Sequence, residues 1–401
     1  MQIKSITLTN FRNYSNQSIE LQNGLNVIVG KNAQGKTNLL EAIFLCAIGR
    51  SPRTTKDKDL VKWDNTMAKI SLSMTKNLGK HIIDMYIFTN QNKAIKIDKI
   101  GIKKIGQLLG TFNAIYFSPD ELKLIKESPE ERRRFMDIDL SQFDKNYFYA
   151  LSNYNKILIQ RNKLLKSSDM NTIKDTLPIW NEQLSSYGAE IIMSRLQLID
   201  SLKVYAKKIH KLLTSNAEDL ELTYVGYTAE NKEELKTILL EKLNENVDKD
   251  IHLGFTTVGP HRDDIKISAN NIDLRSFGSQ GQQRTASLTL KLAELETFKN
   301  RLGEYPVLLL DDVLSELDEN RQNKLLEFIA PIQTLLTCTE FNFNIPHTTI
   351  TISSGNVVNI EKNNWLNYWK YIQNINKTYY VIYYVMQINI WRNLNKTYNE
   401  L

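Results

Sequence analysis

The sequence is poor in cysteine and contains no long apolar run. Only Cys46 and Cys338 occur among its 401 residues, which argues against a disulfide framework and suggests a reducing compartment. No apolar run approaches the roughly 20 residues that a membrane-spanning helix needs. Residues 2–10 alternate apolar and polar side chains and lack the apolar segment of a signal peptide. We therefore expect a cytoplasmic protein without a membrane partner.

The overall composition is that of an ordinary globular protein. Hydrophobic residues make up 42% of the chain and charged residues 24%, and the length allows two domains. The formal net charge of +6 permits a polyanionic partner such as a nucleic acid but does not require one.

The chain divides into four segments by the spacing of its apolar residues. Residues 1–118 are mostly strand-like, with one helix expected after Thr37, and residues 119–245 have helical periodicity. Strand character resumes near Ile251, within a segment of residues 246–360. We therefore predict an α/β head in two halves, 1–118 and 246–360, interrupted by a helical lobe, 119–245. Residues 361–401 form an aromatic-rich tail, rich in tyrosine and tryptophan.

A complete phosphate-binding motif of the form G-x-x-x-x-G-K-[ST] follows a predicted strand. It reads Gly30-Lys31-Asn32-Ala33-Gln34-Gly35-Lys36-Thr37. The two glycines let the backbone turn its N–H groups toward a phosphate, and the following helix adds its positive dipole end. We expect Lys36 to reach the β- and γ-phosphates and Thr37 to ligate Mg²⁺. The sequence therefore predicts a nucleotide site, with ATP and Mg²⁺ as cofactors.

A second apolar strand ends in two carboxylates. Val307-Leu308-Leu309-Leu310 is followed by Asp311 and Asp312, the pattern of a buried parallel strand. Such a strand would place Asp311 beside the phosphate loop to hold Mg²⁺ through water, and Asp312 to orient an attacking water. Taken alone, the pair is equally typical of an acidic turn after a buried strand.

A short polar motif precedes a further predicted helix. It reads Ser279-Gln280-Gly281-Gln282-Gln283-Arg284. A serine hydroxyl and a glycine N–H at a helix N-terminus can bind an anion, although serine is also a favoured capping residue. The strand at Val307 begins shortly after this helix, which favours a second half of a nucleotide site.

Together these motifs resemble those of an ATP-binding-cassette (ABC) ATPase, and more narrowly the RecF family. Further similar stretches occur in family order from residue 1 to about residue 358. They are Leu8–Tyr14, Gly49–Thr54, Phe117–Leu122, Pro129–Asp137, Gln160–Asn162 and Gly259–Asp264. The resemblance implies an ABC-type P-loop ATPase head of mixed sheets and helices, with an inserted helical lobe.

The resemblance also implies roles for individual residues. Residues 30–37 bind ATP, while Lys36, Asp311 and Asp312 serve catalysis. Ser279, Gly281 and Gln282 contact the γ-phosphate held by a partner subunit, and residues 315–318 cross the dimer interface. Residues 333–339 resemble the last strand, after which transport ATPases carry a histidine; Thr339 stands near that place. The shorter Asp312 in place of the usual glutamate, and the absent histidine, predict slow hydrolysis.

The resemblance implies an ATP-dependent DNA clamp. ATP would close two chains into a homodimer on duplex DNA near a single-strand gap, and RecR, with RecO, would help to load RecA. The basic residues Lys93, Lys96, Lys99, Lys103, Lys104 and Arg132–Arg134 are candidates for phosphate contacts, or simply solvated charged faces. The tail departs from the family, and it is expected to be either a non-native extension or a lineage-specific appendage.

Other ABC-type ATPases without a role at DNA gaps remain alternatives. A transporter ATPase would carry the histidine and gives no reason for the helical lobe. An SMC-type protein needs a long coiled coil between Gly30 and Ser279, and that interval is too short and too rich in strands. A metabolic kinase needs no motif at Ser279, so ATP-driven dimerisation separates it from the clamp.

Overall fold

The head is built around a six-stranded sheet that is mostly parallel. The computed structural model describes residues 1–76, 79–167 and 170–363. The sheet has the spatial order β15 (Asn356–Asn363), β14 (His347–Ser353), β3 (Leu25–Val29), β13 (Thr334–Cys338), β12 (Val307–Asp311), β8 (Ala114–Phe117). All neighbours from β14 to β8 pair in parallel, and β15 pairs antiparallel at the edge. The carboxyl ends of β3, β13, β12 and β8 therefore meet at one edge.

The central strands are buried on both faces, which explains their unbroken apolar sequences. Val307 and Leu309 of β12 pack in the core with α1 (Lys36–Ile48), whereas Leu308 and Leu310 pack in the core of the helical lobe. The period of two continues to Asp311, and therefore places its side chain on the α1 side of the sheet.

A second, antiparallel sheet covers the other side of α1. Its spatial order is β2 (Tyr14–Glu20), β1 (Gln2–Phe11), β4 (Met67–Lys76), β5 (Gly79–Phe88), β6 (Ala94–Ile97), β7 (Ile100–Gly101). Buried and more exposed residues alternate along β4 and β5, so one face of this sheet lies in the core that α1 shares. This arrangement confirms the alternating pattern between residues 70 and 102.

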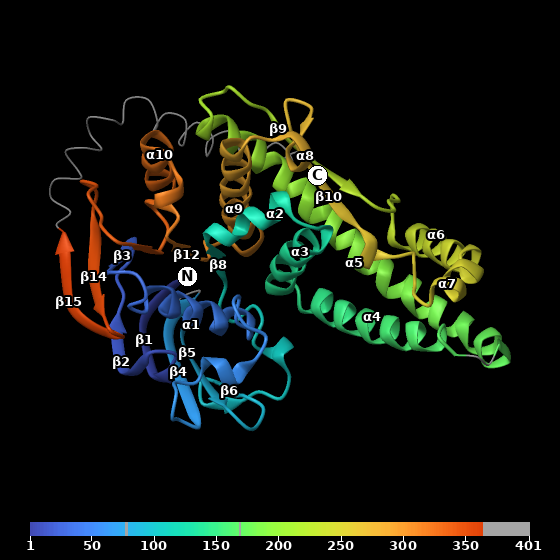
Figure 1. The fold of residues 1–401 in the computed structure, drawn as a ribbon, viewed down its shortest axis with the longest axis horizontal. Coiled ribbons are helices and arrows are strands. Elements are labelled where there is room, and N and C mark those ends of the chain that lie inside the picture. Colours follow the sequence, from blue (N-terminus) through green and yellow to red (C-terminus); the bar gives the residue numbers. More distant parts are fainter. Residues whose placement is uncertain (77–78, 168–169, 364–401) are drawn as a thin grey trace, which may run out of the picture.

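The inserted lobe is an elongated group of helices with a small sheet (Figure 1). Its helices are α2 (Lys123–Lys126), α3 (Pro129–Phe143), α4 (Lys145–Leu164), α5 (Met170–Leu213), α6 (Lys232–Glu245) and α7 (Val247–Leu253). Its sheet joins β9 (Leu220–Val225), β10 (Asp264–Ala269) and β11 (Ile272–Asp273). With 44 residues, α5 is about 66 Å long at 1.5 Å per residue. Figure 1 shows α4 and α5 running side by side away from the head.

A buried ion pair holds together the part of the lobe that lies far from the head. The side chains of Arg161 and Asp250 are fully buried, with 2.7 Å between Nη1 and Oδ2. Arg161 also donates to Asn181 Oδ1 at 2.8 Å and to Thr256 Oγ1 at 2.8 Å. These contacts join α4, α5, α7 and the loop after α7, and a buried charge of this kind requires such partners.

Three further helices follow β11 along the described chain, two before β12 and one after it. They are α8 (Leu274–Phe277), α9 (Gln280–Leu302) and α10 (Glu319–Ile329). Within residues 1–76, 79–167 and 170–363, no helix is both long enough and apolar enough to cross a membrane.

Three expectations from the sequence need correction or comment. The strand expected near Ile251 is wrong: α7 occupies that position, capped by Gly254 in the left-handed region with φ of 70°, and β10 begins only at Asp264. The strand over residues 334–338 forms as β13, but it is not the last, because β14 and β15 follow. The segment expected to be helical contains β9, which pairs with β10 across the predicted boundary at residue 245.

The division of the chain into domains at residues 118, 245 and 360 remains a prediction. Residues 361–363 continue β15, and the remainder of the expected tail, residues 364–401, lies outside the described residues.

Candidate nucleotide site

The phosphate loop lies between β3 and α1, as the sequence predicts. Gly35 is the N-cap of α1 with φ of 113°, a left-handed conformation that glycine adopts without strain. A Cβ at Gly35 would lie 2.7 Å from Asn13 Nδ2, so the site also lacks room for a side chain. The first N–H groups of a helix have no intrahelical acceptor, and here they open onto the loop. The arrangement is suited to binding a phosphate.

The turn between β1 and β2 supports the loop from one side. Asn13 Nδ2 donates to Gln34 O at 2.9 Å, and Asn13 Oδ1 accepts from Asn38 Nδ2 at 2.9 Å. Tyr14 donates its hydroxyl proton to Gly35 O at 2.9 Å. This turn lies in the stretch Leu8–Tyr14, for which the sequence alone suggested no contact with the loop.

The turn between β14 and β15 supports the loop from another side. Gln34 Oε1 accepts from Ser354 N at 2.6 Å, and Gln34 O accepts from Gly355 N at 3.0 Å. The phosphate loop is thus fixed by two hairpin turns that are far apart in the sequence.

Asn13→Ala is expected to weaken ATP binding up to about 30-fold, because two hydrogen bonds worth about 1 kcal/mol each no longer support the loop. Equilibrium dialysis with labelled ATP measures the change, and Asn16→Ala on the exposed face of β2 provides a matched control. Equal affinities of both variants and the unmodified protein would show that the turn does not support the loop.

Lys36 lies over the loop that it is expected to serve. Its Nζ donates to Gly30 O and, at 3.2 Å, to Lys31 O. The side chain is largely buried, so the ammonium group is held where a bound phosphate would be cradled by the loop.

The structure brings Thr37 and Asp311 together. Thr37 Oγ1 donates to Asp311 Oδ1 at 2.9 Å, although the two residues are 274 positions apart. Because the hydroxyl proton points to Asp311, the lone pairs of the Thr37 oxygen are free to ligate a cation. The residues therefore fit a Mg²⁺ ion bound with a nucleotide, since Mg²⁺ usually combines one or two protein groups with phosphate oxygens.

Two further hydroxyls, which the sequence analysis missed, complete the surroundings of Asp311. Thr337 Oγ1 donates to Asp311 Oδ1 at 2.8 Å, and Tyr116 donates its hydroxyl proton to Asp311 Oδ2 at 2.9 Å. Desolvation and the Asp311 carboxylate raise the pKa of Tyr116, which therefore remains a donor. Parallel pairing sets Asp311 opposite Thr337 and Leu309 opposite Tyr116. The contacts of Thr337 and Tyr116 with Asp311 therefore depend on the order of the strands in the sheet, which no single sequence motif reveals.

Asp312 has a left-handed backbone, with φ of 53°. Its N–H donates to Thr337 Oγ1 at 2.9 Å, and its carbonyl oxygen accepts from Ser315 Oγ at 2.7 Å. Desolvation raises the pKa of its carboxyl group, an effect that Lys36 opposes and Asp311 reinforces. Unusual backbone conformations of this kind are often held at functional positions. The exposed carboxylate is thus fixed next to Asp311 and within the field of Lys36.

The motif at Ser279 forms the N-terminus of α9. Ser279 Oγ accepts from Gln282 N at 3.2 Å, and Gln282 Oε1 accepts from Ser279 N at 2.9 Å, which together form a capping box. Gln282 Nε2 also donates to Glu218 Oε1 at 3.0 Å. Ser279 is exposed, and the space beside Gly281 is open. Ser279 therefore caps α9, and the N-terminus of this helix remains accessible to an anion. The structure is compatible with a role in capping and with a role in binding.

The motif does not reach the phosphate loop of its own chain. The side chains of Ser279 and Gln282 bond to each other's backbone N–H groups, and that of Gln282 also to Glu218, and none of these contacts involves residues 30–37. In Figure 1, α8, which directly precedes Ser279, lies beside β10, whereas α1 lies on the far side of β12. The structure thus joins Gly30–Thr37 with Asp311 and Asp312, and leaves the Ser279 motif on another surface.

An ion pair connects α9 to the segment after Asp312. Arg284 pairs with Glu316, which lies in the short helical turn Leu314–Glu316. Asp318 then caps α10 by accepting from Arg321 N at 3.0 Å. The segment of residues 315–318 is therefore tied to the Ser279 helix within one chain.

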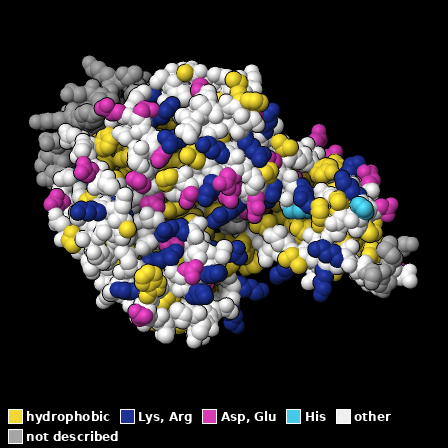
Figure 2. Space-filling view, viewed as in Figure 1, with side chains coloured by type: hydrophobic (Ala, Val, Ile, Leu, Met, Phe, Trp, Pro, Cys, Tyr) yellow, Lys and Arg dark blue, Asp and Glu magenta, His cyan; other side chains and the backbone are white. Residues whose placement is uncertain are grey.

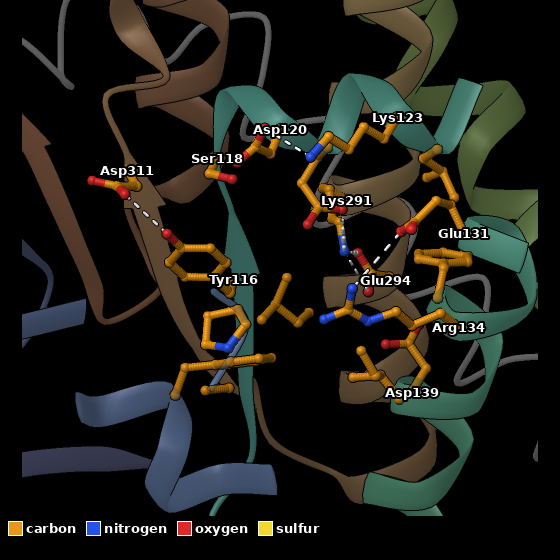
Figure 3. Close-up of a pocket in the computed structure, with 18 of the residues that line it drawn as sticks. Tyr116, Ser118, Asp120, Lys123, Glu131, Arg134, Asp139, Lys291, Glu294 and Asp311 are labelled. Carbon is orange, nitrogen blue, oxygen red and sulfur yellow. Dashed lines mark hydrogen bonds and ion pairs between the residues drawn. The ribbon is translucent and has the colours of Figure 1, made fainter. Parts of the chain in front are cut away.

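A cavity beside Asp311 extends toward a cluster of buried charges (Figure 3). Lys291 of α9 pairs with Glu294 at 3.0 Å and with Glu121, in the segment after β8, at 3.4 Å. Desolvation raises the pKa of Asp139 to about 6 and that of Glu294 well above its ordinary value. Burial of a carboxyl group disfavours its charged form, and a neighbouring ammonium group opposes that effect. The cluster links α3 and α9 to the segment that follows Tyr116.

Comparison with known proteins agrees with this fold. The RecF/RecN/SMC N-terminal domain family matches residues 2–341. "DNA replication and repair protein RecF" of Clostridium botulinum (strain ATCC 19397 / Type A) is 50% identical over 339 residues, which cover 84% of this chain and 93% of the relative. The protein of the same name from Clostridium novyi (strain NT) is 48% identical over the same length and coverage.

Solved structures give the same result. A structure described as "the recombination mediator protein RecF-ATPrS in RecFOR pathway" superposes with a TM-score of 0.83 and 39% identity, covering 89% of this chain and 97% of that one. Its RecF-ATP counterpart gives 0.82 and 38%, covering 90% and 99%. An SMC head bound to the C-winged helix domain of ScpA gives 0.54 at 14% identity, covering 92% and 100%, and shows the fold alone.

The fold and the phosphate loop define an ABC-type ATPase head of the kind shared by RecF and SMC proteins. Within that class, the chain belongs to the RecF family.

Proposed function

We propose that this protein is an ATP-dependent DNA clamp of recombinational repair and replication restart. The observation that carries the proposal is the separation of two half-sites in one chain. Thr37 lies 2.9 Å from Asp311, while the capped end of α9 at Ser279 is exposed elsewhere. A second copy of the chain can present its Ser279 motif to the first copy's nucleotide, so that ATP stabilises only the closed homodimer.

The proposed reaction is slow ATP hydrolysis that opens the clamp. Bound Mg²⁺ would neutralise phosphate charge. Lys36 holds the β- and γ-phosphates, Thr37 offers its oxygen to the cation, and Asp311 orients Thr37. Asp312 accepts a proton from the attacking water. Its side chain is one methylene shorter than glutamate, and Thr339 stands where related ATPases have a histidine; both features favour a switch over a motor, with hydrolysis stimulated by DNA.

The proposed DNA surface is the hollow between the head and the helical lobe. A groove of about 870 Å³ there is lined by cationic side chains, among them Arg50, Arg53, Arg133 and Arg134, and also by the carboxylates of Asp57, Glu130, Glu131 and Asp137. Figure 2 shows Lys and Arg side chains bordering this hollow. Such side chains suit phosphate contacts without reading base sequence.

The candidate basic residues differ in their availability for DNA. Arg132 is buried and paired with Asp264 at 2.5 Å. It is therefore not available to contact a DNA phosphate, contrary to the expectation from the sequence. Lys93 pairs with Asp57 at 2.9 Å. Arg134 is about half exposed, and Lys96, Lys99, Lys103 and Lys104 are exposed; these remain candidates.

The proposed biological setting follows from the family. Relatives carry the name DNA replication and repair protein RecF, and the matched structures concern the RecFOR pathway. We place the clamp on duplex DNA beside a single-strand gap in the cytoplasm, where RecR, with RecO, would help to load RecA.

Sedimentation of the protein with gapped duplex DNA, in ATP and then in ADP, tests the proposal. A DNA-bound dimer in ATP only is the expected result. A protein that stays monomeric and does not bind DNA in either ATP or ADP would contradict the clamp. It would then be an ABC-type ATPase without a role at DNA gaps.

A further inference from the structure

The Walker B carboxylate Asp311 has an unequal distribution of hydrogen bonds on its two oxygens. Oδ1 accepts from Thr37 at 2.9 Å and from Thr337 at 2.8 Å, whereas Oδ2 accepts from Tyr116 at 2.9 Å. A carboxylate oxygen has about two lone-pair sites. Oδ1 is therefore fully used, and Oδ2 keeps one free site.

The ring of Tyr116 is held by packing, while its edge forms part of the wall of the cavity. It is buried in β8, whose four residues are all buried, and it pairs opposite Leu309 of β12. Its ring lies 5.5 Å from the ring of Phe44 on α1, tilted by 35°. Figure 3 shows the Tyr116 hydroxyl directed at Asp311 from the wall of the cavity. The packing of the ring fixes the position of the phenolic oxygen within hydrogen-bond distance of Asp311 Oδ2.

We propose that Tyr116 is a positioning residue that makes the nucleotide site selective for Mg²⁺ over Ca²⁺. This inference rests on the proposed function, because it takes a nucleotide-bound divalent cation at Thr37. Ca²⁺ accepts six to eight oxygen ligands and often binds a carboxylate through both oxygens, whereas Mg²⁺ is octahedral and retains water molecules. Thr37 and Thr337 occupy Oδ1, so direct ligation of a cation by Asp311 would use Oδ2, where Tyr116 takes one of the two lone-pair sites. Without the Tyr116 hydroxyl, both sites of Oδ2 would be open to the larger ligand set of Ca²⁺. The single free site on Oδ2 suits a cation-bound water.

Tyr116 is well placed for this role because it acts on the oxygen that Thr37 does not use. Thr37 and Thr337 fix the orientation of the carboxylate through Oδ1, and Tyr116 limits what Oδ2 can bind. Among the residues that the structure describes, no cluster of three or more His, Cys, Asp or Glu could hold a metal ion.

Tyr116→Phe tests the inference by removing one oxygen atom and retaining the ring. The expected result is an increase of about tenfold in the affinity for ATP with Ca²⁺ relative to ATP with Mg²⁺, the scale of one hydrogen bond to a charged group. Equilibrium dialysis with labelled ATP in each cation measures this ratio without relying on hydrolysis. Tyr154→Phe makes the same change in the lobe, where the hydroxyl pairs with His261, and should leave the ratio unchanged.

The outcomes separate this inference from the proposed function. An unmodified protein that binds no ATP would overturn the nucleotide site itself. Normal binding by the unmodified protein, with an unchanged cation ratio in Tyr116→Phe, would overturn only the role of Tyr116. Equal loss of affinity in both cations, at an unchanged melting temperature, would also contradict selectivity and make Tyr116 a general support of Asp311.

Discussion

Asp312→Asn is expected to reduce ATP turnover by at least about 100-fold, within the range that a general base contributes, while ATP binding and the dimer persist. Asparagine keeps the size of the side chain and tolerates the left-handed backbone at φ of 53°. It cannot accept a proton from water, so the closed dimer should accumulate. Single-turnover hydrolysis and sedimentation in ATP measure the two effects.

Asp64→Asn is a matched control for this variant. Asp64 also has a left-handed backbone, with φ of 65°, and lies exposed in the turn before β4. The control should hydrolyse ATP at the normal rate. Normal turnover by Asp312→Asn as well would remove Asp312 from the reaction.

Ser279→Arg is expected to weaken ATP-dependent dimerisation by on the order of 100-fold or more, the loss seen for a disrupted central contact. Arginine is too large for the open space beside Gly281 to remain available to a partner's phosphate. The affinity of one chain for ATP should not change, because Ser279 bonds to Gln282 and not to the phosphate loop of its own chain. Sedimentation and equilibrium dialysis measure the two quantities separately.

The loss of the helix cap in this variant requires a control. Removing a capping serine costs about 1 kcal/mol, which a melting curve detects. Asn231→Arg removes a side-chain cap, which accepts from Glu234 N at 2.9 Å, at the exposed N-terminus of α6 and should dimerise normally. Dimerisation that survives Ser279→Arg would refute the sandwich arrangement.

Local motifs predicted the parts of the site that are contiguous in the chain. The phosphate loop, the strand that ends at Asp311 and the cap at Ser279 each combine a turn or cap signal with an apolar strand or helix. The structure confirms these elements as β3 with α1, β12, and α9. The roles of the individual residues remain predictions.

Contacts that depend on strand order were beyond the sequence analysis. Tyr116 meets Asp311 across 195 positions, and only the placement of β8 beside β12 brings them together. The same holds for Asn13 and Gln34, which meet because a hairpin turn folds over the loop. The strand wrongly expected near Ile251 could have been recognised as a helix from the local sequence. Gly254 is a helix stop signal, which outweighs a short apolar pattern.

Mixing two inactive variants tests the central claim, that one nucleotide is shared by two chains. Lys36→Ala should lose ATP binding and keep a working Ser279 motif, and Ser279→Arg should do the opposite. A mixed dimer then contains one complete site, formed by Lys36 of one chain and Ser279 of its partner. In ATP, sedimentation should show each variant alone as a monomer and the mixture as a dimer. A mixture that stays monomeric at concentrations well above those that dimerise the unmodified protein would contradict the shared site.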